Sequence, residues 1–258
     1  MGLIDRNPAL RVRNASDVMT PLRAVKTADE IERLRAAAHA VDRIAARLQG
    51  GEIALVGRTE AEVSAELGRQ IIDEGHGVVN FAIVAAGENA ASPHHHAGAR
   101  VIRENEVVLC DFGGTMYGDD GVGYCSDITR CVYTGTPPNE FVELYDVLHR
   151  AQEASVQAAT IGTPAETVDR AGRSIIADAG LGEYFIHRTG HGIGVEAHEE
   201  PYIVEGNRDG LVAGNAFSIE PGIYVPGKWG ARLEDIVVAS SDGPDPLNRA
   251  DHGLAVLA

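Results

Sequence analysis

Cysteine is scarce in this chain of 258 residues, which contains only Cys110, Cys125 and Cys131. An odd number of cysteines without a Cys-x-x-Cys pair fits neither a disulfide framework nor the spacing of a zinc finger. We therefore interpret the three thiols as small side chains that pack in the protein interior.

Long apolar runs and positive charge are also lacking. No uncharged apolar run approaches the roughly 18 residues that a membrane helix needs, and no early segment resembles a signal peptide. The 22 basic and 38 acidic side chains give a net charge of −16, so the field of the protein would repel a phosphate backbone. These absences predict a cytoplasmic protein that binds neither nucleic acid nor a membrane.

The remaining composition, 44% hydrophobic and 23% charged, is typical of a soluble globular protein, and one domain is the simplest interpretation. Residues 1–21 carry polar and proline residues with little periodicity, so we expect an N-terminal arm or linker there. The domain would then occupy residues 22–258, with regular structure beginning at Thr27.

Capping boxes predict where three helices start. Each pairs a threonine with a glutamate three residues later: Thr27 with Glu30, Thr59 with Glu62, and Thr163 with Glu166. Apolar residues at helical spacing extend the first helix to about Leu48, and Pro164 would take the first helical position of the third.

The second and third of these helices resemble each other. When the sequence is shifted by 104 positions, residues 59–81 match residues 163–185 at eight of 23 positions, including Gly-Arg-x-Ile-Ile in both copies. This similarity exceeds what chance composition gives, and it predicts an internal duplication.

Short runs rich in β-branched and aromatic residues, bounded by Gly or Pro, predict the strands. The candidates are Val78–Ala86, Val107–Phe112, Ile128–Tyr133, Tyr184–His187, Ala216–Ile219 and Leu233–Ala239. With the helices, they predict an α+β fold with two pseudo-twofold halves.

Five short segments concentrate acidic residues and histidines beside glycines and prolines near the predicted strand ends. They are 92–96, 111–114, 126–130, 187–201, and 218–222 taken with 232–235. Several carboxylates gathered in one water-poor cleft repel one another unless a cation neutralises them, so the cluster predicts bound metal. An oxygen-rich set with one imidazole suits two Mn²⁺ or Co²⁺ ions, or a catalytic Zn²⁺ pair.

The order and spacing of these motifs resemble the pita-bread metallopeptidases, and among them the Xaa-Pro dipeptidases and aminopeptidases most closely. Glu220 and Glu234 stand 14 residues apart, and His94 and Asp111 stand 17 apart, as in that family. The similarity runs from about Leu22 to the C-terminus. It implies an α+β pita-bread fold with pseudo-twofold halves around a curved antiparallel sheet.

The resemblance also implies the ligands of a dinuclear metal centre. Asp111 matches the bidentate ligand of one ion, and Asp127 and Glu234 match the bridging carboxylates. His191 and Glu220 match the terminal ligands of the other ion. Two divalent ions, Mn²⁺ in first place with Co²⁺ or Zn²⁺ as alternatives, are therefore the expected cofactors.

Four further residues match functional positions of the family. His94 resembles the histidine that hydrogen-bonds near the scissile amide, and His198 resembles the one that contacts the substrate carbonyl. His187 and Arg232 match positions beside the ligands, where a purely structural role is an open alternative.

The mechanism that we expect combines this resemblance with metal chemistry. A water that bridges two divalent ions loses a proton near neutral pH and becomes a nucleophile for the peptide carbonyl. Glu220 would accept that proton and pass it to the leaving nitrogen, while His198 helps to stabilise the oxyanion. The expected substrate is a short peptide, cleaved after its N-terminal residue and preferentially before proline.

Three departures from the family pattern are visible. The spacing from Asp111 to Asp127 is longer than usual, which implies an insertion around residues 117–123. Cys131 replaces a common threonine, a near-isosteric change. The N-terminal domain that Xaa-Pro peptidases usually carry has no counterpart, through truncation or a naturally short chain. That domain helps to build the dimer in the family, so the expectation of a homodimer rests on the resemblance alone.

Three alternatives share this scaffold, and one of them, a binding module, belongs to a different functional class. A methionine aminopeptidase would share the five ligands, but the segments 127–130 and 188–203 resemble the Xaa-Pro branch more closely. A metal-free peptide-binding module on the same fold would have lost ligands, whereas this chain retains all five. The third alternative is amidine hydrolysis of the creatine type. It uses the same scaffold without the full ligand set, so the five retained ligands argue against it.

Overall fold

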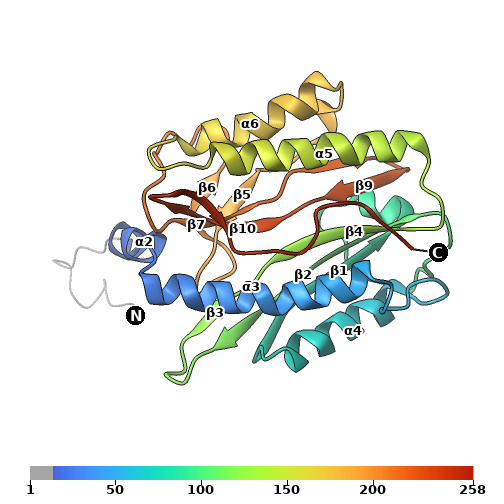
Figure 1. Ribbon diagram of the computed structural model, residues 1–258, viewed down its shortest axis with the longest axis horizontal. Coiled ribbons are helices and arrows are strands. Elements are labelled where there is room, and N and C mark those ends of the chain that lie inside the picture. The colour runs from blue at the N-terminus through green and yellow to red at the C-terminus, as the bar shows by residue number, and fades with distance from the viewer. Residues whose placement is uncertain (1–13, 258) are drawn as a thin grey trace, which may run out of the picture.

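The computed structural model describes residues 14–257, in which two pairs of long helices enclose the strands (Figure 1). Helices α3 and α4 lie along one long side of the molecule, and α5 and α6 lie along the other. The helices are α2 (Ser16–Ala24), α3 (Ala28–Gln49), α4 (Glu60–Asp73), α5 (Asn139–Ala158) and α6 (Ala165–Asp178).

The strands form two five-stranded sheets and one hairpin. The first sheet contains β1 (Val78–Ala86), β2 (Val107–Tyr117), β3 (Gly123–Cys125), β4 (Ile128–Thr134) and β12 (Ala255–Leu257). The second contains β5 (Gly190–Gly192), β6 (Glu199–Ile203), β7 (Ala216–Ile219), β10 (Asp235–Ser240) and β11 (Gly243–Pro246). Strands β8 (Gly222–Val225) and β9 (Trp229–Arg232) form the hairpin. The short 3-10 helices are η1 (Gly87–Ala91) and η2 (Gly182–Tyr184).

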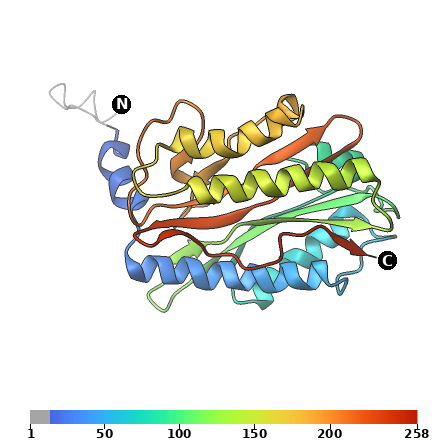
Figure 2. The same cartoon turned by 45° about the horizontal axis from the view of Figure 1, so that its top comes forward.

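Strand pairing is antiparallel except between β4 and β12. An isolated antiparallel bridge between Thr129 and Glu234 joins β4 to the segment before β10, so the two sheets meet at that point. Helices α5 and α6 lie over the strands of the second sheet (Figure 2). The molecule therefore has a helical layer on each side of its strands.

Apolar residues of the helices meet those of the strands in separate clusters. Ile44 and Leu48 of α3 and Leu67 of α4 pack with Val84 and Val108 of the first sheet. On the other side, helix α5 packs on β2, β4 and the β8–β9 hairpin through another cluster. Burial of these surfaces on both sides holds the strand ends, and the polar side chains they carry, in fixed positions.

Two of the three predicted capping boxes are confirmed. Thr27 and Glu30 exchange hydrogen bonds at the start of α3, and Thr59 and Glu62 do so at the start of α4. The box at Thr163 is wrong, because Pro164 is the N-cap of α6 and no side chain caps it. Thr163 Oγ1 instead contacts Thr160 Oγ1, and the Glu166 carboxylate accepts from the Gly206 N–H.

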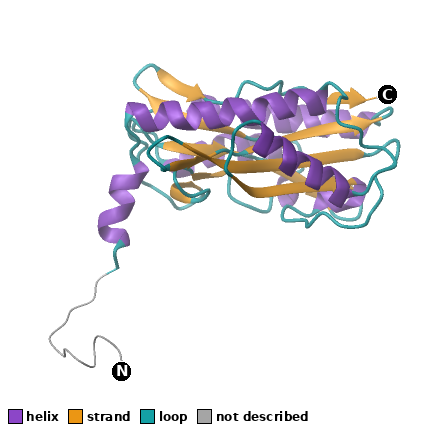
Figure 3. Ribbon diagram, turned by 90° about the horizontal axis from the view of Figure 1, so that it is seen from below, coloured by secondary structure: helices purple, strands orange, loops and turns teal. Residues whose placement is uncertain are grey.

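Regular structure begins earlier than the sequence pattern predicted. Ser16–Ala24 forms α2, with Pro21 inside it, at one end of the molecule (Figure 3). The remainder of the predicted arm, residues 1–13, lies outside the described residues. Helix α2 has no buried side chain, which explains why no clear apolar periodicity marked it.

Each predicted strand is confirmed, with shifts at some ends, except Tyr184–His187. Tyr184 ends η2, and residues 185–187 follow it without strand pairing, because the Arg173 guanidinium binds the carbonyl oxygens of Phe185 and His187. The predicted insertion around residues 117–123 forms the turn of a hairpin between the end of β2 and β3, in which Tyr117 pairs with Gly123.

Each half contains two consecutive helices and then three strands that pair in chain order, with β3 inserted in the first half and β6 and the β8–β9 hairpin inserted in the second. The series is α3, α4, β1, β2 and β4 in the first half, and α5, α6, β5, β7 and β10 in the second. The predicted register is wrong by one residue, since helix bounds and buried positions match at an offset of 105. The buried pairs are Val63 with Val168, Leu67 with Gly172, and Ile71 with Ile176.

The two Gly-Arg-x-Ile-Ile motifs therefore occupy different helix faces. Gly172 lies where an added Cβ would meet the Ala151 carbonyl oxygen at 2.7 Å, whereas the nearest atoms at Gly68 belong to Val79 at 3.8 Å.

Among the helices of the described residues 14–257, none combines the length and the apolar character that a membrane span requires.

Candidate metal centre

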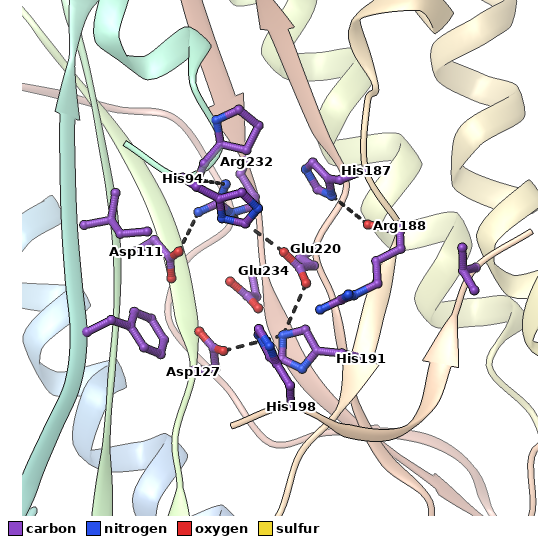
Figure 4. A pocket seen from close by; sticks show the side chains of 14 residues that line it. His94, Asp111, Asp127, His187, Arg188, His191, His198, Glu220, Arg232 and Glu234 are labelled. Atoms are coloured by element: carbon purple, nitrogen blue, oxygen red, sulfur yellow. Dashed lines mark hydrogen bonds and ion pairs between the residues drawn. The ribbon is translucent and has the colours of Figure 1, made fainter. Parts of the chain in front are cut away.

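One cavity of about 460 Å³ gathers every site residue that the sequence predicted. Its lining includes Asp111, Asp127, His191, Glu220 and Glu234, together with His94, His187, His198 and Arg232. Figure 4 shows these side chains converging from both halves of the molecule. No role was predicted for the remaining lining residues, which are Phe81, Ile83, Pro93, Arg188 and Val204.

The acidic residues lie on strands or just beyond their ends. Asp111 lies on β2, Asp127 precedes β4, and Glu220 follows β7. Glu234 lies between β9 and β10, beside the bridge that joins the sheets. Each half of the fold thus supplies carboxylates to one cavity.

His191 presents one ring nitrogen to this group of carboxylates. Its Nε2 lies 3.3 Å from Glu220 Oε1 and 3.8 Å from Asp127 Oδ2. Its Nδ1 donates to the carbonyl oxygen of Gly192 at 3.1 Å, so the neutral ring keeps its lone pair on Nε2. Burial, together with nearby His198, lowers the pKa of His191 to about 3. This tautomer is the one that can bind a metal through Nε2.

Two glycines allow strand β5 to carry His191 into this position. A Cβ added at Gly190 would overlap the carbonyl oxygen of Ser218, and one at Gly192 would overlap that of Glu200. Only residues without a side chain permit this close approach of β5 to its neighbours. The glycines around His191 in the sequence are therefore explained by packing.

The carboxylates are too close together to remain charged without a cation. Burial and the charge of Glu234 raise the pKa of Asp127 well above its usual range, and burial and Glu220 do the same for Glu234. Burial likewise raises the pKa of Glu220 to about 7, although Arg232 acts in the opposite direction. Mutual repulsion of this kind is relieved by a bound divalent ion.

The donor atoms fit such an ion. One ligand atom from each of Asp127, His191 and Glu234 lies within 4.8 Å of the other two. Within residues 14–257, Asp111 Oδ1 and Asp127 Oδ1 are buried without a hydrogen-bond partner. Carboxylate oxygens without hydrogen-bond partners, beside an imidazole nitrogen with a free lone pair, form an oxygen-rich set of atoms available to bind a divalent ion.

Arg232 is the centre of a hydrogen-bond network along one wall. Its guanidinium donates to Asp111 Oδ2 at 2.5 Å, to Thr129 Oγ1 at 3.0 Å and to the Tyr224 hydroxyl at 2.8 Å. Thr129 in turn donates to Glu234 Oε2 at 2.6 Å. No role was predicted for Thr129 or Tyr224. The sequence did carry one signal for Thr129. It lies two residues after Asp127 at the start of a strand, and alternate residues of a strand lie on the same face.

The same network orients His187. Its Nδ1 donates to the Arg188 carbonyl oxygen at 2.7 Å, and its Nε2 accepts from the Tyr224 hydroxyl at 2.8 Å. Burial and the charge of Arg232 lower the pKa of His187 to about 3, which keeps the ring neutral.

His94 and His198 lie on loops at the mouth of the centre. The His94 loop is held by buried Glu60, which accepts hydrogen bonds from His95 Nε2 at 2.8 Å and the Ala86 N–H at 2.9 Å. The His198 ring centroid lies 4.1 Å from that of His191. Both rings line the cavity without belonging to the carboxylate group.

Comparison with known proteins identifies the family. Residues 32–241 match the model of metallopeptidase family M24. The chain belongs to metallopeptidase family M24. It is 50% identical over 243 residues to the probable dipeptidase PepE of Mycobacterium tuberculosis, covering 94% of this chain and 63% of that protein. It is 42% identical to the Xaa-Pro dipeptidase of Lactobacillus delbrueckii subsp. lactis, covering 95% of this chain and 65% of that one.

The pita-bread fold expected of this M24 chain is confirmed. The crystal structure of dipeptidase PepE from Mycobacterium ulcerans superposes with a TM-score of 0.92 at 48% identity. The match covers 99% of this chain and 67% of that one. The M24 chain thus spans about two thirds of the length of these relatives.

Proposed function

We propose that this chain hydrolyses the peptide bond after the N-terminal residue of short peptides, preferentially when proline follows. The observation that supports it most directly is the convergence of four carboxylates and the free Nε2 of His191 in one cavity. The Xaa-Pro preference is supported by the similarity to the Lactobacillus Xaa-Pro dipeptidase. A cavity of about 460 Å³ falls in the range of small-ligand sites.

Five residues would hold two divalent ions in this proposal: Asp111, Asp127, His191, Glu220 and Glu234. Asp127 and Glu234 are the carboxylates most suited to bridging, since they lie with His191 in the tightest group of donors. We propose Mn²⁺ as the native ion because carboxylate oxygens dominate the set. When bound, such ions supply Lewis-acid activation of water and of the peptide carbonyl.

The side chains of the protein would then move the proton and hold the substrate. Glu220 Oε1 faces His191 and accepts from Ser218 Oγ at 3.2 Å, so the carboxylate is fixed in place to accept a proton from water and deliver it to the leaving nitrogen. His198 would donate to the carbonyl oxygen as negative charge develops there. His94 would hydrogen-bond near the scissile amide from the opposite loop.

The neighbouring residues orient these groups. Arg232 holds Asp111, and Thr129 holds Glu234, through the contacts described above. Phe81, Ile83 and Val204 supply apolar lining suited to a proline ring, whose nitrogen offers no N–H for recognition.

A side-by-side assay tests the proposal. Purified protein is loaded with Mn²⁺ or Co²⁺ and offered Xaa-Pro dipeptides, longer Xaa-Pro peptides and Met-Ala peptides. We expect metal-dependent hydrolysis with the Xaa-Pro peptides fastest. Fastest cleavage of Met-Ala would indicate a methionine aminopeptidase, and no bound metal with no hydrolysis would indicate a binding module.

A further inference from the structure

Asp169 is a fully buried carboxylate on α6 that is not among the residues lining the cavity. Its two oxygens accept four hydrogen bonds. Arg173 donates from Nε to Oδ2 at 2.8 Å and from Nη2 to Oδ1 at 2.9 Å. The N–H and the hydroxyl of Thr189 donate to Oδ1 at 3.1 Å and 2.7 Å. Because all four partners are donors, this position requires a side chain that only accepts.

The carboxylate holds the segment that leads to the histidine ligand. Arg173, paired with Asp169, donates to the carbonyl oxygens of Phe185 and His187 at 3.0 Å and 2.7 Å. Its guanidinium carbon also lies 3.9 Å from the centroid of the Phe185 ring. Asp169 therefore fixes the backbone of residues 185–189 at three points, one of them directly and two through the guanidinium.

The same segment holds the carboxylate that we propose to carry the proton. The Glu220 N–H donates to the carbonyl oxygen of Thr189 at 2.7 Å. The Thr189 backbone thus connects two carboxylates, since its N–H donates to Asp169 and its carbonyl oxygen accepts from Glu220. His191 follows two residues later and lines the cavity with Glu220 (Figure 4). A displacement of Thr189 would therefore move both of these side chains.

We propose that Asp169 is a positioning residue of the metal centre. Through Thr189 it fixes two proposed ligands of one ion, Glu220 and His191. This inference rests on the proposed metallopeptidase function and adds to it a residue outside the cavity. Mutation of groups that orient metal ligands typically lowers metal affinity or activity by about 10- to 100-fold. Because Asp169 acts through a backbone segment, we expect the lower end of that range.

Asp169→Asn tests the proposal, because it keeps the shape of the side chain but replaces one acceptor oxygen with a donor. The affinity for Mn²⁺, titrated against a competing chelator, should fall by about 10-fold. At saturating Mn²⁺, kcat for Ala-Pro should fall by about 10-fold with KM little changed, since Glu220 is proposed to act in proton transfer. Asp178→Asn makes the same change at an exposed position of α6 and should leave all three quantities at the wild-type values.

Substitutions at Thr189 test the same link from its other end. Thr189→Val removes the hydroxyl that donates to Asp169 and should lower the Mn²⁺ affinity in the same direction. Thr189→Ser retains the hydroxyl and should stay near wild type. An equal loss in both variants would assign the effect to packing of the side chain. If Asp169→Asn does not fold, as judged by circular dichroism, the Thr189 pair still decides the proposal.

Double-mutant cycles on Mn²⁺ affinity separate positioning from a general loss of stability. Asp169→Asn combined with Glu220→Gln should weaken binding by less than the product of the two separate factors, because the ligand that Asp169 positions is already weakened. Combined with Thr129→Val, which acts on Glu234 from the first half, the separate factors should multiply. Multiplication in both combinations would make Asp169 merely structural and overturn the proposal.

The metal titration does not depend on turnover, so the two proposals can fail separately. If wild type binds Mn²⁺ but cleaves no peptide, the peptidase function is refuted and the affinity cycles still decide the role of Asp169. If wild type cleaves Xaa-Pro peptides and Asp169→Asn equals it in Mn²⁺ affinity and kcat, the positioning role alone is refuted. Absence of Mn²⁺ binding by wild type would refute both.

Discussion

Lys26 Nζ lies 3.0 Å from Glu199 Oε2, and both side chains are almost fully buried. Glu199 also accepts from Arg23 Nη2 at 2.6 Å and from the Glu196 N–H at 3.0 Å. Glu199 directly follows His198, whereas Arg23 and Lys26 lie at the end of α2 and just beyond it. The pair therefore anchors the loop of a proposed catalytic histidine to the N-terminal helix.

We expect Glu199→Gln to destabilise the protein by about 3 kcal/mol at pH 7, because it leaves the buried Lys26 ammonium without a countercharge. Urea unfolding measures the change. Leu22→Gln, an exposed position on the same helix, is the control and should have little effect.

The effect of Glu199→Gln should depend on pH. Burial acts to raise the pKa of Glu199, but hydrogen bonds from Arg23 and Glu196 and the charge of Lys26 outweigh it and lower the pKa. The carboxylate therefore contributes fully above its unfolded pKa of about 4.3, and the contribution is lost as pH falls through the lower folded value. A stability difference between wild type and variant that grew on acidification would contradict this assignment.

Thr129→Val should weaken metal binding by about 10- to 100-fold without changing any ligand. The substitution removes the hydroxyl that donates to Glu234 and accepts from Arg232, so both groups lose their fixed orientation. Titration with Mn²⁺ against a competing chelator measures the affinity. Thr129→Ser retains the hydroxyl, and an equally large loss in that variant would assign the effect to packing.

Glu220→Gln should abolish turnover more thoroughly than it lowers metal content. The amide cannot accept the proton of water, and general acid–base contributions are typically about 10² to 10⁴ in rate. Asp127→Asn and Glu234→Gln should lower both quantities, since each removes a carboxylate expected to bridge two ions. Turnover and metal stoichiometry are measured on the same samples. Near wild-type turnover of Glu220→Gln in excess Mn²⁺ would move the proton transfer to another residue.

Matched glycine substitutions test the register of the two halves. Gly68→Ala should stabilise the protein by up to about 1 kcal/mol, because an added Cβ would meet Val79 at 3.8 Å without overlap and alanine favours the helix. Gly172→Ala should destabilise it by about 1 to 3 kcal/mol through overlap with Ala151 and Ser155. Thermal unfolding of both variants measures this, and equal effects would favour the register that aligns Gly68 with Gly172.

Helix starts could be predicted where the signal lay within a few residues. The boxes at Thr27 and Thr59 form because threonine and glutamate meet across one turn wherever the helix packs. The same pattern failed at Thr163, where Gly206 and Arg170 engage Glu166 from another segment and from the next turn. A tertiary contact competed with the local one and prevailed.

The internal repeat shows the same limit. The number of identical residues favoured an offset of 104, but the buried faces of α4 and α6 correspond at an offset of 105. Burial decides which residues of two helices are equivalent, and identity of a glycine or arginine does not.

By itself, the sequence determined the family, the α+β class and nine of the residues that line the cavity, because ordered acidic and histidine motifs at set spacing are readable along the chain. Only the tertiary structure decided which arginine is free. Arg232 is satisfied by Asp111, 121 residues away, and Arg188 is oriented by Tyr202 but unpaired within the described chain. Partners of a buried charge are chosen by the packing of distant segments, so no local pattern distinguishes the two guanidinium groups.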